Sequence, residues 1–170
     1  EQNNRFVVDK NDFSVTVNDQ KITFDVVFNA IHGTPGEDGL IQAYLKLLNI
    51  PQTSCNYYQS ALTFNKRDML SVLKPYGIKT AISYYLNKGD VIAEDQIIQR
   101  VGLPCFVKPN KSGSSFGISM VKESEQLLPA IEKAYAEDDE IIIESYLNGT
   151  EVSVGVIKYQ NDTIVLPITE

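Results

Sequence analysis

Short alternating and apolar runs dominate the beginning of the chain. Phe13–Val17 alternates between apolar and polar residues, and the polar Asn18–Gln20 separates it from Ile22–Phe24. Alternation with a period of two is typical of a half-exposed strand, and Asn and Asp favour tight turns, so the pattern predicts a β-hairpin. Asp25–Ile31 is nearly continuously apolar. Such a run is typical of a strand covered on both faces, as in a parallel α/β sheet.

A helix and a further strand are predicted after this apolar run. Apolar residues recur at helical spacing beyond the turn at His32–Gly39. We therefore expect a helix over residues 40–48 and a strand at Ile50–Thr53. Together with the apolar run, these elements form a predicted β-turn-α-β unit.

From residue 57 onward the pattern favours an antiparallel module. Helices are predicted to begin near Lys66, to span Glu94–Val101, and to follow Ser124 as N-cap. The last two predicted strands form a hairpin around Asn161-Asp162. The predicted strands are Ala81–Leu86, Cys105–Val107, Ile118–Val121, Glu140–Glu144, Glu151–Lys158 and Thr163–Ile168. The predicted fold class is α/β, a parallel module followed by an α+β part with an antiparallel sheet.

Charge and cysteine content exclude several functions. The chain has 170 residues and a net charge of −7. Nucleic-acid binders neutralise phosphates with cationic side chains, so we expect no nucleic-acid partner. No apolar run approaches the length of a membrane span, so we expect no membrane partner. Cys55 and Cys105 lack metal-ligand spacing and indicate a reducing, cytoplasmic location.

The strongest chemical feature is the serine- and glycine-rich loop of residues 109–117, which follows Lys108. Glycines let backbone N–H groups approach an anion closely, while serine hydroxyls and the charges of Lys108 and Lys111 add further attraction. The Walker A spacing and the G-x-G-x-x-G pattern are both absent from the sequence. The loop therefore suits either a polyphosphate or, equally, a mobile solvated hairpin connection.

Three further features have both a chemical and a structural interpretation. The turn at His32–Gly39 lies where open α/β sheets bind ligands, but its glycines and acidic residues also suit a turn and a helix start, which we favour on spacing alone. Glu144 and Glu151 can bind a metal, act as acid and base, accept hydrogen bonds from sugar hydroxyls, or simply face water. Lys66, at a predicted helix start, opposes the helix dipole and hints at an anionic partner.

Four segments, in chain order, resemble the motifs of one enzyme family, the D-alanine–D-alanine ligases. They are HG-x-x-GEDG-x-x-Q at His32–Gln42, S-A-L-x-x-D-K at Ser60–Lys66 with Asn65 in place of Asp, V-K-P-x-x-x-G-S-S-x-G at Val107–Gly117, and I-E-x-x-x-x-G-x-E-x-x-V at Ile143–Val154. Any one of these matches alone is modest, but their common order makes the resemblance specific.

The resemblance implies an ATP-grasp enzyme of peptidoglycan synthesis that joins two D-alanines through an acyl phosphate, with ATP and Mg²⁺ as cofactors. It implies that Lys66 and Lys108 hold the ATP phosphates, and that the loop around Ser114 and Ser115 closes over them. Ser114 also matches the catalytic serine that positions the first D-alanine, and His32 matches the histidine near the carboxylate of that substrate.

The same analogy assigns the rest of the nucleotide site. Glu151 takes the ribose hydroxyls, and adenine is recognised by Glu144 and the main chain of Ser145, Tyr146 and Leu147. The resemblance places no metal ligand within this chain and implies that those ligands follow residue 170. It leaves open a homodimer of the full-length enzyme.

By this resemblance the chain is divided into three parts. Residues 1–56 are the latter part of an N-terminal substrate-binding domain, 57–143 are the central ATP-grasp subdomain, and 144–170 are the first strands of the C-terminal subdomain. We therefore expect a fragment, truncated at both ends, with little or no ligase activity alone. Alternatives are a D-alanyl–D-lactate or D-alanyl–D-serine ligase, a non-catalytic ATP-binding module, and a plain structural domain.

Overall fold

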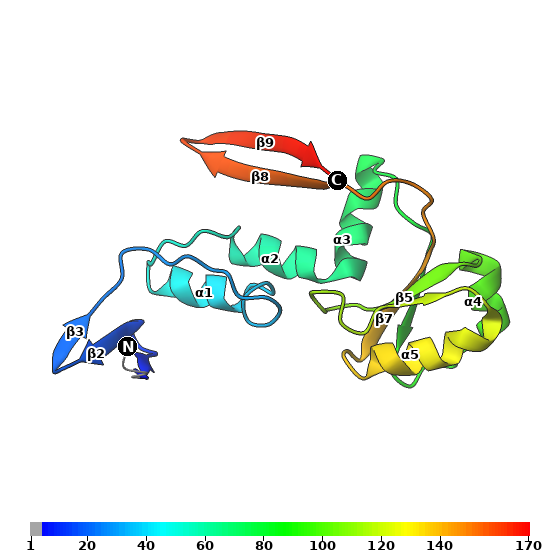
Figure 1. Ribbon diagram of the computed structural model, residues 1–170, viewed down its shortest axis with the longest axis horizontal. Helices are drawn as coiled ribbons and strands as arrows, with labels where there is room; N and C mark the ends of the chain where they lie inside the picture. Colours follow the sequence, from blue (N-terminus) through cyan, green and yellow to red (C-terminus); the bar gives the residue numbers. More distant parts are fainter. Residues whose placement is uncertain (1–4) are drawn as a thin grey trace.

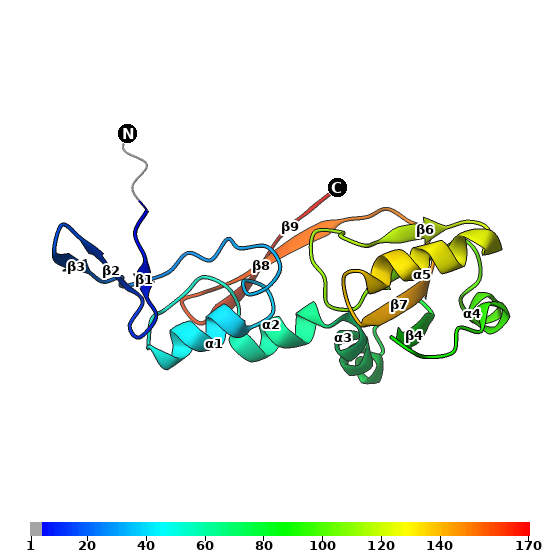
Figure 2. The same cartoon turned by 90° about the horizontal axis from the view of Figure 1, so that it is seen from below.

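The structure is a computed structural model that describes residues 5–170. Figures 1 and 2 show an elongated arrangement, with a small N-terminal sheet at one end and a larger sheet with two helices at the other. Three helices lie between them: α1 (Leu40–Leu47), α2 (Tyr57–Phe64) and α3 (Lys66–Leu73). This arrangement places the segments around His32 and around Ser114 on neighbouring parts of the molecule.

The N-terminal sheet is the predicted hairpin with one extra short strand. β1 (Val8–Asp9), β2 (Ser14–Val17) and β3 (Gln20–Ile22) pair antiparallel in that order. Asn18 and Asp19 both adopt left-handed φ angles, 49° and 61°, which suit a two-residue turn between twisted strands. The hairpin is confirmed, but its second strand starts at Gln20 rather than at Ile22, because the turn uses only two residues.

The predicted buried strand at Asp25–Ile31 is wrong. Val27 makes an isolated parallel bridge to Gln52, in which the Val27 N–H donates to Pro51 O at 2.9 Å and the Thr53 N–H donates to Val27 O at 3.2 Å. The bridge has the predicted parallel direction. Within residues 5–170, however, Asp25–Ile31 belongs to none of the sheets and has no strand beside it. Phe28 is consequently 79% exposed.

Three short helices follow. α1 (Leu40–Leu47) confirms the helix predicted after the turn, and α3 (Lys66–Leu73) begins at Lys66 as predicted. α2 (Tyr57–Phe64) was not predicted, because its apolar residues form no clear stripe and its main sequence signal is the cap Asn56, whose side chain accepts a hydrogen bond from the Gln59 N–H at 2.9 Å. A 3₁₀ turn, η1 (Lys74–Tyr76), ends α3.

The larger sheet is antiparallel, with the strand order β4 (Ser83–Asn87), β7 (Glu140–Ser145), β5 (Cys105–Pro109) and β6 (Ser119–Val121). α4 (Glu94–Val101) and α5 (Leu127–Tyr135) cover one face, as Figure 2 shows for α5. Alternate strand residues point into this core, which comprises Leu86, Ile97, Val101, Cys105, Val107, Val121, Leu127, Ala130, Ile131, Ala134, Ile141 and Ile143. The intervening residues of β5 and β7 point to the opposite face, called here the open face.

Helix ends in this module follow local chemistry. α4 has the predicted bounds, because acidic Glu94 and Asp95 open it and Gly102, at φ 74°, ends it. The predicted cap Ser124 is wrong. Glu123 is the N-cap of the 3₁₀ turn η2 (Ser124–Gln126) that leads into α5, and it forms a capping box with Gln126. Among the described residues, no helix is both long and apolar enough to cross a bilayer.

A second hairpin, β8 (Ser153–Tyr159) with β9 (Asp162–Thr169), closes the chain. Its pairing confirms the predicted hairpin, but the left-handed turn residues are Gln160 and Asn161, at φ 48° and 70°, one position earlier than predicted. Every residue of both strands is exposed. In Figure 1 this hairpin stands apart from the larger sheet.

Candidate functional site

Two predicted site residues meet on the open face of the larger sheet. Lys108 of β5 and Glu144 of β7 are diagonal neighbours on adjacent strands. Lys108 Nζ donates to Glu144 Oε2 at 2.8 Å, and the two side chains are only 26% and 13% exposed. Lys108 Nζ also lies 5.4 Å from the centroid of the Phe106 ring. A charged pair is thus held on a rigid strand surface and partly withdrawn from water.

Lys66 approaches this region from the first position of α3. Its Nζ donates to Ser112 O at 2.8 Å and to Asn110 O at 3.2 Å, so the ammonium is bound to the start of the serine-glycine loop. Burial lowers the pKa of Lys66, and the neighbouring charge of Lys108 lowers it further. Two lysines that repel one another in a partly desolvated place are stabilised by an anion between them.

The serine-glycine loop joins β5 to β6 through tight turns, in which three residues adopt the left-handed backbone conformation. Ser114 and Ser115 adopt left-handed φ angles of 49° and 59°, and Gly117 has φ 72°. A Cβ at Gly117 would collide with the side chains of Pro109 and Glu137, so only glycine fits there. The Phe116 N–H donates to Gly113 O at 3.2 Å and closes the tip.

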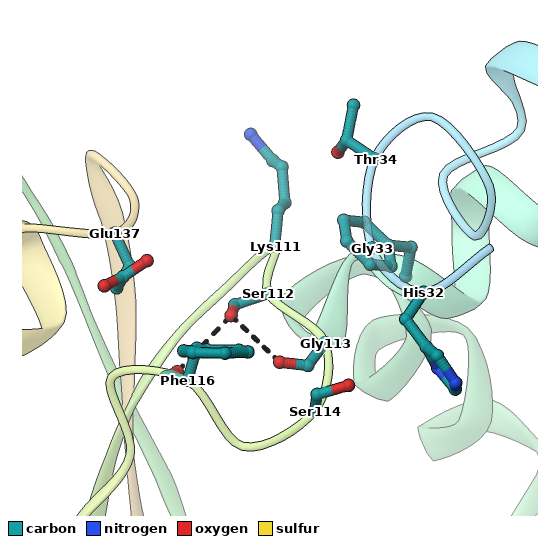
Figure 3. A pocket seen from close by; sticks show the side chains of 10 residues that line it. His32, Gly33, Thr34, Lys111, Ser112, Gly113, Ser114, Phe116 and Glu137 are labelled. Atoms are coloured by element: carbon teal, nitrogen blue, oxygen red, sulfur yellow. Dashed lines mark hydrogen bonds between the residues drawn. The ribbon is translucent and has the colours of Figure 1, made fainter. Parts of the chain in front are cut away.

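This loop faces the His32 turn across a cavity of about 300 Å³ (Figure 3). The cavity brings together His32 and Ser114, which are far apart in the sequence, whereas Ser115 is not among its lining residues. It is lined by His32, Gly33, Thr34, Phe64, Lys111, Ser112, Gly113, Ser114, Phe116 and Glu137. The two predicted D-alanine-binding residues therefore share one hollow.

The acidic residues of the His32–Gly39 turn have the structural roles that spacing favoured. Glu37 Oε2 accepts a hydrogen bond from the Gly33 N–H at 2.6 Å, and Asp38 Oδ1 accepts one from the Leu40 N–H at 3.1 Å at the start of α1. Gln42, 3% exposed, donates from Nε2 to Gly36 O at 2.6 Å. This bonding fixes the backbone that presents His32 to the cavity.

The serine-glycine loop passes close to the His32 turn at Gly113. A Cβ at Gly113 would lie 2.7 Å from Glu37 Oε2 and 3.6 Å from the Gly33 backbone N, so a larger residue there would require the Glu37 carboxylate to shift. The His32 turn and the serine-glycine loop are thus in direct contact, which the two separate sequence motifs did not reveal.

Two residues at the end of β7 use their backbone N–H groups for hydrogen bonds to residues that precede neighbouring strands. The Ser145 N–H donates to Ile82 O at 2.9 Å, and the Tyr146 N–H donates to Pro104 O at 3.2 Å. Of the three residues whose main chain is predicted to recognise adenine, only Leu147 has a backbone N–H that makes no such bond within the described residues. Glu151 lies further on, exposed, in the connection to β8, and among the described residues the ion pair of Lys108 is with Glu144 and not with Glu151.

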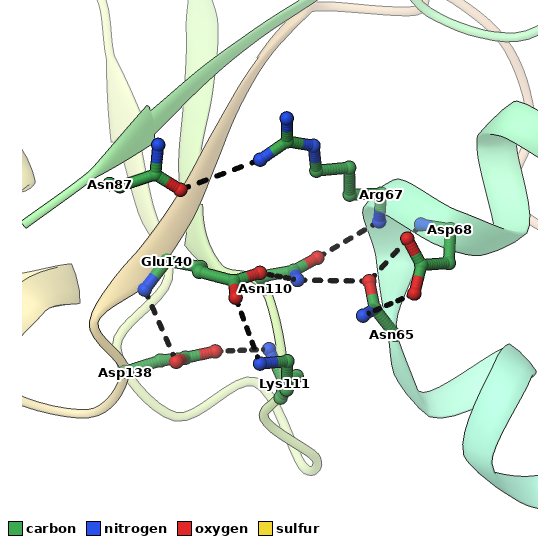
Figure 4. A network of polar contacts seen from close by, with 8 residues as sticks. All are labelled: Asn65, Arg67, Asp68, Asn87, Asn110, Lys111, Asp138 and Glu140. Atoms are coloured by element: carbon green, nitrogen blue, oxygen red, sulfur yellow. Dashed lines mark hydrogen bonds and ion pairs between the residues drawn. The ribbon is translucent and has the colours of Figure 1, made fainter.

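Asn110 was missed by the sequence analysis. It is 1% exposed, follows β5 directly, and binds α3 and β7 through its side chain (Figure 4). The only available signal was a polar residue at the end of a buried strand, and the matched ligase motif has an unspecified residue at this position.

The donor set fits phosphates better than a metal ion. Two lysines and a loop rich in backbone N–H groups match the chemistry of ATP phosphates. Between residues 5 and 170, no group of three or more His, Cys, Asp or Glu side chains is arranged to hold a metal ion.

Family models cover nearly the whole chain. The model described as D-ala D-ala ligase N-terminus matches residues 2–55, and that described as D-ala D-ala ligase C-terminus matches residues 72–170. Curated relatives agree. The chain is 74% identical over 165 residues to D-alanine--D-alanine ligase of Flavobacterium johnsoniae and 60% identical over 165 residues to that of Christiangramia forsetii. Each match covers 97% of this chain and 51% of the relative, so the chain spans about half the length of these curated relatives.

Solved structures place the fold in the same group. D-alanyl-alanine synthetase A from Vibrio cholerae matches with a TM-score of 0.85 at 27% identity, over 96% of this chain and 50% of that one. VanG D-Ala:D-Ser ligase from Enterococcus faecalis matches with a TM-score of 0.82 at 32% identity, over 96% and 48%. The predicted α/β class with an antiparallel central sheet is thereby confirmed. Motifs, fold and relatives agree, and the chain belongs to the D-alanine–D-alanine ligase family.

Proposed function

We propose that this chain provides the ATP-phosphate site and part of the D-alanine site of an ATP-dependent ligase that joins two D-alanines for peptidoglycan synthesis in the cytoplasm. The observation that supports this most directly is the convergence of Lys66, Lys108 and the serine-glycine loop within a chain of this family. A carboxylate is a poor electrophile, so the first D-alanine is activated as an acyl phosphate before the second amino group attacks it.

Phosphoryl transfer depends mainly on positioning and charge neutralisation. An ammonium group has three N–H donors. Two of those on Lys66 are directed to carbonyls of the loop, which leaves one for a phosphate oxygen. Lys108 is held beside Glu144 and can offer its remaining donors in the same way. Ser114 and Ser115 close over the phosphates with the loop.

We further propose the binding roles of the remaining residues. The Leu147 amide and Glu144 bind adenine beside the Phe106 and Tyr146 rings, whose centroids lie 6.1 Å apart. Ser145 and Tyr146 hold that segment in place through the sheet, while Glu151 takes the ribose hydroxyls. His32 and Ser114 position the first D-alanine across the cavity that they line.

The proposed domain division follows the same logic. Residues 1–56 belong to a substrate-binding domain, 57–143 to the central ATP-grasp subdomain, and 144–170 to the start of the C-terminal subdomain. In this proposal the Mg²⁺ that accompanies ATP is bound by residues other than those described here.

Two experiments test the proposal. Isothermal titration calorimetry of the 170-residue chain with ATP measures nucleotide binding directly. A chimera, in which this chain replaces the matching 165 residues of the Flavobacterium johnsoniae ligase, measures ligation. We expect the chimera to release ADP only with D-alanine present, and Lys108→Ala to lower its kcat/KM at least about 100-fold. Lys88→Ala, on an exposed ion pair, serves as the control. A folded chimera that binds ATP but forms no dipeptide contradicts the proposal.

A second candidate is a D-alanyl–D-serine or D-alanyl–D-lactate ligase. The fold match to a D-Ala:D-Ser ligase at a TM-score of 0.82 supports keeping it. Competition among D-alanine, D-serine and D-lactate in the native protein would separate these activities. ATP binding without any ligation would favour a non-catalytic module instead.

A further inference from the structure

Asn110 is a polar side chain in an almost completely buried place. It is 1% exposed, and both ends of its amide are hydrogen-bonded. Nδ2 donates to Asn65 Oδ1 at 2.9 Å and to Glu140 Oε2 at 2.8 Å, while Oδ1 accepts from the Arg67 N–H at 2.9 Å. A buried amide costs free energy unless its donors and acceptor are paired, so the folded state strongly favours this one orientation of the Asn110 side chain.

Most of these bonds end on the first turn of α3. Asn65 is the N-cap, Lys66 is the first helical residue and Arg67 is the second. The first N–H groups of a helix lack partners within the helix, and Asn110 supplies them. Its side chain accepts from Arg67, and its main-chain O accepts from the Lys66 N–H at 3.3 Å and from Lys66 Nζ at 3.2 Å.

The same residue is fixed to the sheet on its other side. The Asn110 N–H donates to Glu140 O at 2.8 Å, and its side chain reaches the Glu140 carboxylate. Glu140 in turn pairs with Lys111 at 3.1 Å. Figure 4 shows Asn110 between α3 and the strand that contains Glu140. The position of Lys66 relative to Lys108 is therefore set through Asn110.

We propose that Asn110 is a positioning residue for Lys66, which it holds where the ammonium reaches a phosphate of bound ATP. This inference rests on the proposed ATP-binding function. Asn110 does not itself contact the nucleotide. Removing its side chain breaks the bonds to Asn65, Arg67 and Glu140 but leaves the main-chain carbonyl bound to Lys66, so Lys66 is held less firmly although its charge remains.

Substitutions of Asn65 test this network of hydrogen bonds without removing Asn110 or Lys66. The Asn65 Oδ1 accepts from both Asn110 Nδ2 and the Asp68 N–H. Aspartate at this position keeps both acceptor bonds but replaces the donor bond from Asn65 Nδ2 to Asp68 Oδ2, 2.7 Å long, by repulsion between two carboxylates, whereas alanine removes all three bonds. Asn65→Asp combined with Asp68→Asn, which turns the donor round and avoids the repulsion, should therefore preserve ATP affinity, and Asn65→Ala should weaken it.

The deciding experiment is a double-mutant cycle on the 170-residue chain, with ATP affinity measured by calorimetry. We expect Lys66→Ala and Asn110→Ala each to weaken ATP binding about tenfold, which is about 1.4 kcal/mol. In the Lys66→Ala background, Asn110→Ala should add less than about a twofold loss, because it acts through Lys66. Lys88→Ala should bind ATP like the wild type, since its ion pair with Asp139 is exposed.

The possible outcomes are distinct. A purely structural Asn110 would give additive losses, about 100-fold in the double variant, and would overturn the positioning role. ATP binding that is insensitive to Lys66→Ala would overturn it too. If Asn110→Ala does not fold, the cycle is run with Asn65→Ala, and wild-type affinity in that variant overturns the inference. A wild-type chain that does not bind ATP overturns the proposed function itself.

Discussion

The larger sheet and the β8–β9 hairpin have the same kind of antiparallel hydrogen bonding but very different surroundings. Ile141, Ile142 and Ile143 of β7 are at most 1% exposed, whereas every residue of β8 and β9 is exposed. Backbone pairing alone leaves a two-stranded hairpin marginal in water, while helices covering a sheet provide apolar burial. Lys108 and Glu144 therefore rest on the part of the chain that has a buried core, whereas the hairpin relies on its backbone pairing, its cross-strand contacts and its turn.

The largest expected difference comes from matched isoleucines. Ile143→Ala removes a fully buried side chain and should lower the free energy of unfolding by about 3 kcal/mol, because it leaves a cavity. Ile157→Ala in β8, where the side chain is 47% exposed, should cost less than about 1 kcal/mol. Urea denaturation followed by circular dichroism measures both. Equal losses would show that the hairpin has a core of its own.

Breaking the Lys108–Glu144 pair should have an intermediate effect. Lys108→Ala leaves a carboxylate that is 13% exposed without its counter-charge, at a cost of about 1–3 kcal/mol. Lys88→Ala breaks a pair whose side chains are 62% and 76% exposed and should cost less than about 0.5 kcal/mol. Thermal denaturation compares the two. Adding Glu144→Gln to Lys108→Ala should recover part of the loss, and no recovery would mean that the charge of Glu144 is not the cause.

The turn of the hairpin offers a smaller, stabilising change. Asn161 has φ 70°, a conformation that glycine adopts without strain. Asn161→Gly should therefore stabilise the β8–β9 pairing by about 0.5 kcal/mol, since the two-residue turn favours glycine at its second position. Amide hydrogen exchange should slow in β8 and β9 and stay unchanged in β7. Slower exchange in β7 as well would show that the hairpin and the sheet unfold together.

Acid should weaken the larger sheet slightly before it affects the hairpin. A hydrogen bond from Lys111 lowers the pKa of Glu140 below its ordinary 4.5. The folded state thus holds this proton less tightly, so the stabilisation is present above pH 4.5 and is lost as the pH falls through the lowered value. Because the Glu140 side chain is 34% exposed, salt should reduce the effect. Proton NMR spectra recorded between pH 6 and 3 follow the loss of the folded signals of the larger sheet. Glu140→Gln should abolish the part of this pH dependence that comes from Glu140.

Much of the larger sheet could be predicted from local pattern. The bounds of α4 follow from acidic residues at its start and Gly102 at its end, and the strands around Ile141 and Val107 follow from their apolar runs. These signals lie within a few residues of the elements that they define. The apolar run at Asp25–Ile31 misled because burial depends on neighbouring strands, which a local pattern does not contain.

The site was only partly predictable for the same reason. Lys108 and Ser114 lie in a recognisable motif, and His32 lies in another, so each was named from the sequence. The contact between Gly113 and Glu37, and the bonds of Asn110 to Asn65 and Arg67, join residues that are distant in the chain. No short-range periodicity encodes such contacts.

The two-sided character of β7 has a consequence for how reliably the chain folds. Ile141 and Ile143 face the helices, while Glu140, Ile142 and Glu144 face the other way. A slip of one residue in strand pairing would exchange these faces and press two carboxylates against Leu86 and Ile97. Misaligned chains therefore lose their core together with the Lys108–Glu144 pair. The same register of β7 therefore buries the core isoleucines and positions the charged pair, so a chain with the correct packing also has a correctly placed Lys108–Glu144 pair.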